Sequence, residues 1–446
     1  MADLLTIGSS GLRAYSRALE TTSSNIANSQ TAGYVRRTVR TEDRSAVSHQ
    51  VLYNSQISPD GVLAGNIDRA VDSFLIEDAR AAGSESGRTG IRLSSAEAVE
   101  RAIDDGPSGV GQNITRVFNA ADALSSDPAN TTRRANFLQA VADTTDAFRT
   151  TASRLQTVSA SIVADAQVSS SQLNTDLNAL RRVNQGLQSA RDGSTNQASL
   201  FDERDRLIDS VSTATGVIAS FDARGVATLR AAGPSSDLLV DATTAATVSV
   251  TTASDGTLSF SVSNGTTSAL TPTTGRLAGL TRAASDLAAK RTELDTVATR
   301  FATDINTAHQ AGTDANGNPG SALVALGSGA ASIVAISLSP SEVAAADSAS
   351  ENGNILAFAT LRGSSGAEAG FAALVAQQAQ ITASARAQDA AATSRQNGAD
   401  EARSALSGVD LDQEAADLVR YQQAYEGAAR TIQVARETLQ TILNLF

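Results

Sequence analysis

The sequence of 446 residues contains no cysteine and no tryptophan, and Lys290 is its only lysine. Without cysteine the chain has no disulfide, no thiolate nucleophile and no thiolate metal site. The formal charge is −12, from 35 basic and 47 acidic residues, and the arginines are dispersed among carboxylates. Because no basic face stands out, we expect no nucleic-acid partner.

Long apolar runs are also missing from the sequence. No stretch of about 18 apolar residues occurs, so we expect no insertion into a membrane. The start, Met1–Ala2–Asp3, has no basic segment followed by an apolar block. We therefore expect no cleaved signal peptide.

Aromatic residues make up only 4% of the chain, while hydrophobic residues make up 41%. This hydrophobic content is too high for wholesale disorder. A core with few aromatic rings must use many small contacts, which favours long helices packed side by side. Residues 127–187 contain one proline, Pro128, and one glycine, Gly186. They predict one long helix with Pro128 in its first turn and a length of about 90 Å, and hence a rod-shaped molecule.

The remaining pattern divides the chain into helical and β-rich parts. Residues 217–274 are rich in Val, Thr and Ser in short alternations with "SDGT" and "SNGT" turns, which predicts an all-β insert. Residues 312–354 predict an irregular connection, either pinned along the rod or partly mobile. Further helices are predicted at 4–30, from 68, and at 199–217, 276–311, 366–406 and 410–446; short strands are predicted at 34–40, 47–53 and 61–67.

The predicted fold class is mainly α with an all-β insert, built on long coaxial helical arms in an elongated rod of several domains. We expect a terminal coiled-coil domain from 1–35 and 408–446, with the two chain ends side by side. A long-helix rod domain with small β elements is expected from 36–216 and 275–407, and a β-rich outer insert from 217–274.

Both ends of the chain show heptad spacing, which is typical of helices that pack on other helices. Near the N-terminus, Leu5, Leu12, Leu19 and Ile26 recur every seven residues. Gly8, Tyr15 and Thr22 each stand three residues after one of the first three. Heptads also occur inside any helical bundle, but the short N-terminal helix is a small partner for the C-terminal one. We therefore expect both ends to fold fully only in an assembly with neighbouring subunits. The predicted assembly interface consists of Leu5, Leu12, Tyr15, Leu19, Ile26, Leu411, Leu418, Tyr421, Tyr425, Ile432, Leu439, Ile442 and Phe446.

A turn motif, "NSQTAGY", follows the first predicted helix. It comprises Asn28, Thr31, Gly33 and Tyr34. Glycine at a helix exit tolerates positive φ, so Gly33 is expected to permit the turn and Tyr34 to anchor it. Alternatively, Tyr34 only fills a small gap in the packing.

Signatures of catalysis or metal binding are weak. His49 and His309 are far apart in sequence, and neither has a second histidine at metal-ligand spacing. No G-x-S-x-G, H-E-x-x-H or G-x-x-x-x-G-K motif occurs. We therefore predict a protein that is not an enzyme, with no catalytic residue, no cofactor and no metal site.

The acidic residues have ordinary structural explanations. A glycosidase would need two carboxylates, and Asp104 with Asp105 or Glu203 with Asp205 would be the candidates, but any acidic helical protein contains such pairs. Residues 314–318, "DANGN", resemble a calcium loop without its later glutamate, which favours a turn. Asp202 and Arg206, four residues apart, predict a solvated ion pair on one helix face.

Several segments resemble the flagellar axial proteins, the superfamily of rod, hook and hook-associated proteins. Residues 9–37 are similar to the N-terminal motif of this superfamily, which ends in N-x-x-T-x-G-Y. The most specific segment is "VDLDQEAADLVRYQQAYEGAARTIQVARETLQTIL" at 409–443, and "GVLAGNIDRAVDSFLIEDAR" at 61–80 and "LFDERDRLID" at 200–209 add to it. These segments cover both helical arms, and the β insert is unmatched.

The resemblance implies a structural subunit that joins hook to filament in the bacterial flagellum and adapts their lattices by stacking its terminal helices. It implies export by the flagellar type III apparatus to the cell exterior. The implied partners are further copies in a helical or ring assembly, the hook protein, a second hook-associated junction protein, and an export chaperone at the C-terminal helix. The alternatives are another axial protein (the second junction protein, the hook protein or a distal rod protein), a type III secreted coiled-coil effector, or a cell-wall hydrolase carried on the axis.

Overall fold

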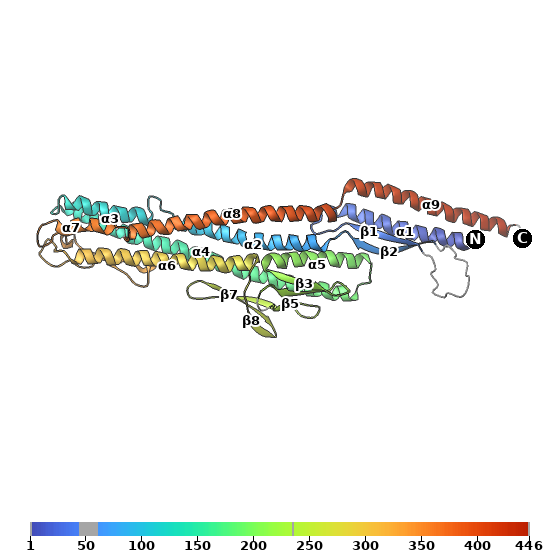
Figure 1. Cartoon of the computed structure of the whole chain (residues 1–446), viewed down its shortest axis with the longest axis horizontal. Coiled ribbons are helices and arrows are strands. Elements are labelled where there is room, and N and C mark those ends of the chain that lie inside the picture. The colour runs from blue at the N-terminus through green and yellow to red at the C-terminus, as the bar shows by residue number, and fades with distance from the viewer. Residues whose placement is uncertain (1, 44–60, 234–235, 445–446) are drawn as a thin grey trace.

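The computed structural model describes residues 2–43, 61–233 and 236–444, and it shows a long helical rod with a small β-rich part on one side (Figure 1). The helices are α1 Ala2–Ala27, α2 Ser73–Ala102, α3 Val110–Ser125, α4 Thr131–Ser189, α5 Thr195–Ala214, α6 Gly275–Gln310, α7 Gly353–Ala357, α8 Ala367–Ser407 and α9 Leu411–Leu443. The strands are β1 Arg37–Asp43, β2 Val62–Arg69, β3 Val217–Phe221, β4 Ala227–Ala231, β5 Leu238–Val240, β6 Thr247–Thr252, β7 Leu258–Asn264, β8 Thr266–Leu270, β9 Val324–Ala325 and β10 Val334–Ala335. The predicted fold class is confirmed.

The helix α4 runs for 59 residues, as its lack of internal helix breakers predicts. Asn130 caps its start by accepting a hydrogen bond from the Arg133 N–H at 3.2 Å. Pro128 lies in the turn before this cap, so its predicted place in the first helical turn is wrong. Asparagine accepts the orphan N–H groups of a helix start, whereas proline offers no acceptor side chain.

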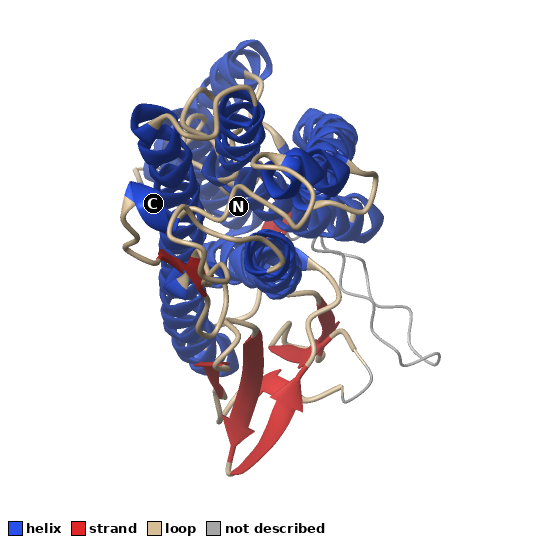
Figure 2. Ribbon diagram, turned by 90° about the vertical axis from the view of Figure 1, so that its left-hand side faces the viewer, coloured by secondary structure: helices blue, strands red, loops and turns tan. Residues whose placement is uncertain are grey.

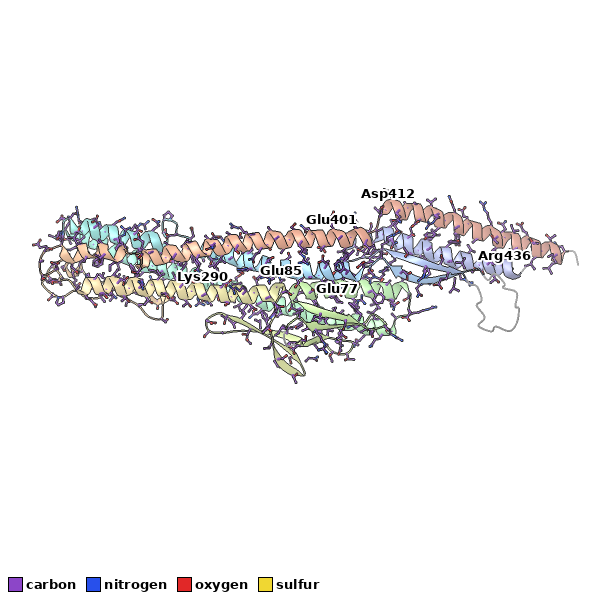
Figure 3. The ribbon with its side chains drawn as sticks, in the orientation of Figure 1. Glu77, Glu85, Lys290, Glu401, Asp412 and Arg436 are labelled. Carbon is purple, nitrogen blue, oxygen red and sulfur yellow. The ribbon has the colours of Figure 1, made fainter. Side chains whose placement is uncertain are left out.

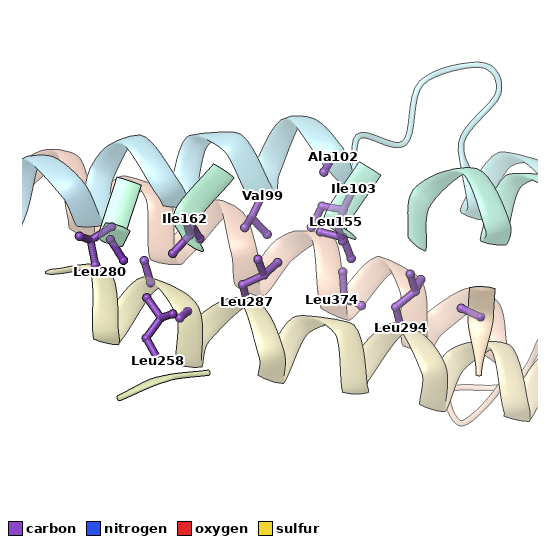
Figure 4. Close-up of a cluster of buried hydrophobic side chains, with 14 of the residues drawn as sticks. Val99, Ala102, Ile103, Leu155, Ile162, Leu258, Leu280, Leu287, Leu294 and Leu374 are labelled. Atoms are coloured by element: carbon purple, nitrogen blue, oxygen red, sulfur yellow. The ribbon is translucent and has the colours of Figure 1, made fainter. Parts of the chain in front are cut away.

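The rod is a bundle in which α2 packs on α6 and α8, and α4 packs on α3, α5 and α6 (Figures 1 and 4). The end of the rod that carries α3 and α7 is called the distal end. Its core contains fully buried large side chains along the whole length, among them Leu155, Leu173 and Leu180. Two ring pairs, Phe148 with Phe301 and Phe137 with Phe358, have centroids 5.7 and 5.6 Å apart. Burying these side chains stabilises the rod without help from another chain.

The β-rich insert forms two three-stranded antiparallel sheets, β3-β4-β5 and β6-β7-β8. It projects from one side of the helices (Figure 2). Gly256 lies in the turn between β6 and β7 with a φ of +91°, a conformation that suits glycine. Asn174 of α4 fastens the second sheet, since its amide bonds to the Val248 O at 2.8 Å and its Oδ1 accepts the Val248 N–H at 2.7 Å.

The irregular connection of residues 312–352 is pinned to the rod. The buried His309 ring bonds to the Ser321 O through Nδ1 at 2.6 Å and accepts the Ala344 N–H through Nε2 at 2.9 Å. Arg134 of α4 donates to the Val343 O at 2.7 Å. Of the two predicted alternatives for this connection, the pinned one is therefore correct.

The N-terminal elements are shifted from their predicted positions. Helix α1 ends at Ala27, β1 covers 37–43 instead of 34–40, and the strand predicted at 47–53 lies outside the described residues. The helix predicted from 68 begins at Ser73, because β2 stays paired with β1 up to Arg69. Asp72 then caps α2 by accepting the Phe74 and Leu75 N–H groups.

Candidate assembly site at the paired chain ends

The two chain ends pair as predicted, with α1 lying along α9 at one end of the rod (Figure 1). The contact is made by small residues. A Cβ added to Gly8 would lie 2.6 Å from Cγ1 of Ile432, and one added to Gly11 would lie 3.3 Å from the Ala428 Cβ. Ala435 of α9 is 1% exposed. The two helices therefore approach closely and bury few large side chains.

The predicted interface residues lie around this contact and only partly inside it. The buried positions on α1 are all small or polar: Gly8, Ser10, Gly11, Ala14, Ala18, Thr21, Thr22 and Asn25. Nine predicted residues are half-buried: Leu5, Leu12, Tyr15, Leu19, Ile26, Leu418, Tyr421, Ile432 and Leu439. Leu411, Tyr425 and Ile442 are exposed, and Phe446 lies outside the described residues. Much of the apolar surface at the chain ends is thus left uncovered in the single chain.

Further apolar side chains of α9 face away from α1. Val419 is 50% exposed and Val434 58%, and Leu443 at the end of the helix, on the side of Ile432, is 71% exposed. The sequence reasoning missed these residues because they fall outside the strongest heptad. Monomeric proteins rarely leave an apolar stripe along an isolated helix, so this face is a candidate contact with another chain.

The turn after α1 is built by the motif residues. Thr31 Oγ1 donates to Asn28 Oδ1 at 3.2 Å, and Gly33 has a φ of +81°. The Tyr34 hydroxyl donates to Asn25 Oδ1 at 2.8 Å and thereby ties the turn back to the helix. Burial raises the pKa of Tyr34, so the hydroxyl keeps its proton.

Asn25 and Glu414 link the two chain ends, and the sequence reasoning overlooked this role. Asn25 is 1% exposed, and its Nδ2 donates to the Arg37 O at 2.8 Å and to Glu414 Oε2 at 3.0 Å. Arg36 Nε donates to the other oxygen of Glu414 at 2.8 Å. A signal was present: Asn25 continues the spacing of Gly11 and Ala18, and Glu414 that of Tyr421 and Ala428, so both polar residues stand on inward-facing heptad positions.

A network of buried ion pairs continues from this point into the rod. Arg37 donates to Asp202, and Arg69 bridges Asp202 and Asp205 at 2.8 Å each. The ion pairs that extend the network to α2 and α8 are Arg204–Asp205, Arg80–Asp205, Arg80–Asp209 and Arg403–Asp209. We call this set the joint network, and it ties the paired ends to α5, α2 and α8.

The joint network corrects the sequence prediction for Asp202 and Arg206. Asp202 is 8% exposed and pairs with Arg37 and Arg69 from other elements, whereas Arg206 pairs with Glu203. The predicted solvated pair is therefore wrong. Sequence spacing reports neighbours on one helix, but β1 and β2 deliver these arginines from residues far along the chain.

Burial and charge act in opposite directions within the joint network. Burial raises the pKa of Asp202, and the guanidinium groups of Arg69 and Arg37 offset only part of the rise. Burial also acts on Asp205, but Arg204 and Arg69 outweigh it and hold the pKa of Asp205 below its ordinary value. Each carboxylate is thus stabilised by several arginines, and loss of one partner leaves a buried charge underpaired.

The remaining candidate residues have structural roles. Asp105 caps α3 by accepting the Gly111 N–H at 2.8 Å. Asp314 accepts the Asn316 and Asn318 N–H groups at 2.8 Å each and closes a turn, as predicted. His49 lies outside the described residues.

The described residues contain no group of three or more His, Asp or Glu side chains that could hold a metal ion. Within the described part of the chain, no helix combines the length and the apolar character that crossing a membrane requires.

Known families match both ends and the middle of the chain. Residues 96–324 match the family described as "Flagellar hook-associated protein FlgK helical domain". Residues 5–34 match "Flagella basal body rod protein", and residues 403–445 match "Flagellar basal body rod FlgEFG protein C-terminal".

Two curated relatives share the name flagellar hook-associated protein 1. The relative from Bacillus subtilis (strain 168) is 28% identical over 223 residues, which cover 48% of this chain and 43% of the relative. The relative from Salmonella typhimurium is 25% identical over 223 residues, which cover 49% of this chain and 39% of the relative. The match therefore spans less than half of each relative's length.

A solved structure shares the fold. The flagellar hook junction protein FlgK from Burkholderia pseudomallei aligns with a TM-score of 0.51 at 19% identity, over 56% of this chain and 46% of that one. The class that the fold defines is an elongated helical protein with paired chain ends and a lateral β insert. Because the helical-domain match covers more than half of the residues, the chain belongs to the flagellar hook-associated protein FlgK family.

Proposed function

We propose that this chain is an extracellular, non-enzymatic structural subunit of the bacterial flagellum that joins hook to filament. In this proposal the paired ends, residues 1–35 and 408–446, stack coaxially with those of neighbouring copies. The long-helix rod (36–216 and 275–407) and the β insert (217–274) lie farther out. The observation that carries the proposal is the uncovered apolar face of α9, since a helix with so little apolar contact to its own chain needs neighbours to cover it.

The proposed partners follow from the same surface and from the family. Further copies, the hook protein and a second hook-associated junction protein would cover the predicted interface residues and Val419 and Val434. Before export, a chaperone would cover the same apolar face of α9. The motif Asn28, Thr31, Gly33 and Tyr34 would turn the chain outward from the axis.

The test is deletion of the gene, followed by electron microscopy and an assay for flagellin in the medium. We expect hooks without filaments and free flagellin outside the cell, with normal filaments after complementation. Immunogold labelling should place the protein directly next to the hook. Missing hooks would instead indicate a hook or rod protein, and unchanged flagella would refute a structural role.

A further inference from the structure

A groove beside the paired ends is lined by arginine side chains with hydrogen-bond donors that have no acceptor within the described residues. It has a volume of about 520 Å³ and is lined by α1, by Tyr425 of α9, by Arg37 of β1, by Ile67 of β2 and by Thr195 at the start of α5. We call it the arginine groove because Arg13, Arg17 and Arg37 line it, with Glu20 as the one acidic residue among its lining residues. Leu12 and Tyr425 add apolar surface.

The arginines of this groove have unused hydrogen-bonding capacity. Arg13 is exposed and has no acceptor among the described residues. Arg17 donates one hydrogen bond, to the Gly193 O at 2.7 Å. Arg37 is 4% exposed, and its buried Nε has no hydrogen-bond partner. Because the Arg37 Nε is buried inside the chain, the donors that a neighbouring chain can reach are those of Arg13 and Arg17.

The complementary charges lie on the far side of α9. At about 100° per residue, Asp412, Glu426 and Glu437 lie on the face turned away from Tyr421 and therefore from α1. All three are exposed, and no arginine or lysine pairs with them among the described residues. Val419, Val434 and the exposed Arg430 lie on the same face, so it combines apolar side chains with three carboxylates and one guanidinium. Asp412 marks the start of this face in Figure 3.

We infer that the arginine groove of one copy receives the carboxylate of Glu426 from α9 of a neighbouring copy. Glu426 follows Tyr425 directly, so it stands at the height of the groove along the helix axis, and a neighbour at similar height would present it there. Arg13 would meet the carboxylate, and Leu12 and Tyr425 would contact the adjacent apolar surface. Because Glu426 is not among the residues that line the groove, the contact joins two different surfaces, and such a head-to-tail contact can repeat around a ring or helix. The inference rests on the proposed assembly.

The absence of cysteine allows a direct test by disulfide formation. The variant Ser16→Cys/Glu426→Cys places one thiol in the groove and one on the acidic face of every copy. Oxidation of assembled flagella, followed by non-reducing electrophoresis, should give a ladder of linked copies. The matched control is Ser16→Cys/Arg154→Cys, since Arg154 is exposed on α4 in the rod; it should give no ladder.

A charge reversal gives an independent readout if the cysteine variant fails to assemble. Arg13→Glu should reduce swimming by placing like charges together, and Arg13→Glu/Glu426→Arg should restore it. Arg154→Glu is the control for a reversed arginine outside the groove. Normal flagella that carry the protein next to the hook but give no ladder, or an Arg13→Glu strain that swims like Arg154→Glu, would overturn the inference and leave the proposed function standing. Absence of the protein from flagella would instead overturn the proposed function.

Discussion

The rod and the paired ends are built from the same kind of helix but are held together in different ways. In the rod, Phe137, Phe148 and Phe301 are fully buried. In the paired ends, the close contact is between glycine, alanine and the flank of Ile432, while Val434 remains 58% exposed. A buried large side chain stabilises by about 1.5–3 kcal/mol, and small residues contribute much less. The rod thus has a core of its own, whereas the paired ends have a core that other chains must complete.

The largest effect should come from the rod core. Phe301→Ala removes a ring that is 1% exposed and packs on Phe148. We expect it to lower the free energy of unfolding by about 3–5 kcal/mol, because the cavity adds to the lost burial. Thermal unfolding of the monomer followed by circular dichroism measures this loss.

The control for this prediction is Val434→Ala on the open face of α9, which should leave the main transition unchanged. If Val434→Ala destabilised the monomer as much as Phe301→Ala, the contrast between the two regions would be wrong.

A smaller effect is expected at the joint network, which connects the two regions. Asp202→Asn keeps the size of the side chain but removes the charge that Arg37 and Arg69 share. The loss should be roughly 1.5–3 kcal/mol, the range for hydrogen bonds to charged groups. Hydrogen exchange should increase in β1, β2 and the start of α5 and stay unchanged at the distal end of the rod.

The control variant for the joint network is Glu203→Gln, which removes the charge of an exposed ion pair with Arg206 on the same helix. Exposed pairs contribute about 0–1 kcal/mol, so this variant should unfold almost like the wild type. Equal losses in both variants would show that burial of the joint network is not what stabilises it.

The third prediction concerns the close contact of α1 with α9. Gly8→Val must displace Ile432, and overpacking of this kind costs about 1–3 kcal/mol. The monomer should lose helical signal at the chain ends and become open to proteolysis there, while the rod transition stays unchanged.

Gly427 is the matched control, because a Cβ added there meets nothing within 4 Å. Gly427→Ala should raise helix stability by about 0.5–1 kcal/mol, since alanine loses less backbone freedom than glycine in a helix. A gain of helical signal in Gly8→Val as well would mean that the two helices do not approach closely at this position.

The two regions were also unequally predictable from the sequence. The unbroken helix of α4 and the β insert follow from local signals: the absence of proline and the single glycine, Gly186, in 131–189, and the alternating Val, Thr and Ser after 217. Heptad spacing correctly paired the chain ends and included Gly8, but Gly11 and Ala18, which also lie buried on α1, were not among the predicted positions; Leu5, Leu12 and Leu19 lie half-buried beside them. Small residues pack closest, and a search for large apolar residues overlooks them.

The joint network could not be read from the sequence for a different reason. Arg37, Arg69 and Asp202 lie in three separate elements, and only the tertiary fold brings them together. Local spacing instead suggested a pair between Asp202 and Arg206. The turn at Gly33 could be predicted because the tolerance of glycine for positive φ and the following Tyr34 are local features. The role of Asn25 could not, because it depends on Glu414, 389 residues away.

The smallest effect should be a pH dependence at the distal end of the rod, far from the paired ends. Burial lowers the pKa of His309, although the bond to Ser321 and the charge of Asp314 partly oppose it. The unfolded chain, with a histidine pKa of about 6.5, therefore binds the proton more readily than the folded chain, and stability falls as the pH drops below about 6.5.

Protonation would also give Nε2 a hydrogen that faces the Ala344 N–H, so the loss should begin in the pinned connection of residues 312–352. Hydrogen exchange measured at pH 7.5 and 5.5, with each rate divided by the intrinsic rate at that pH, should show less protection of this segment at pH 5.5, and His309→Gln should remove the dependence. A slope of equal size at the paired ends, or one that survives His309→Gln, would assign the pH response to other groups. If the slope stays confined to the distal end, then the rod with its own core responds to pH through a residue of that core, while the paired ends respond to the presence of neighbours.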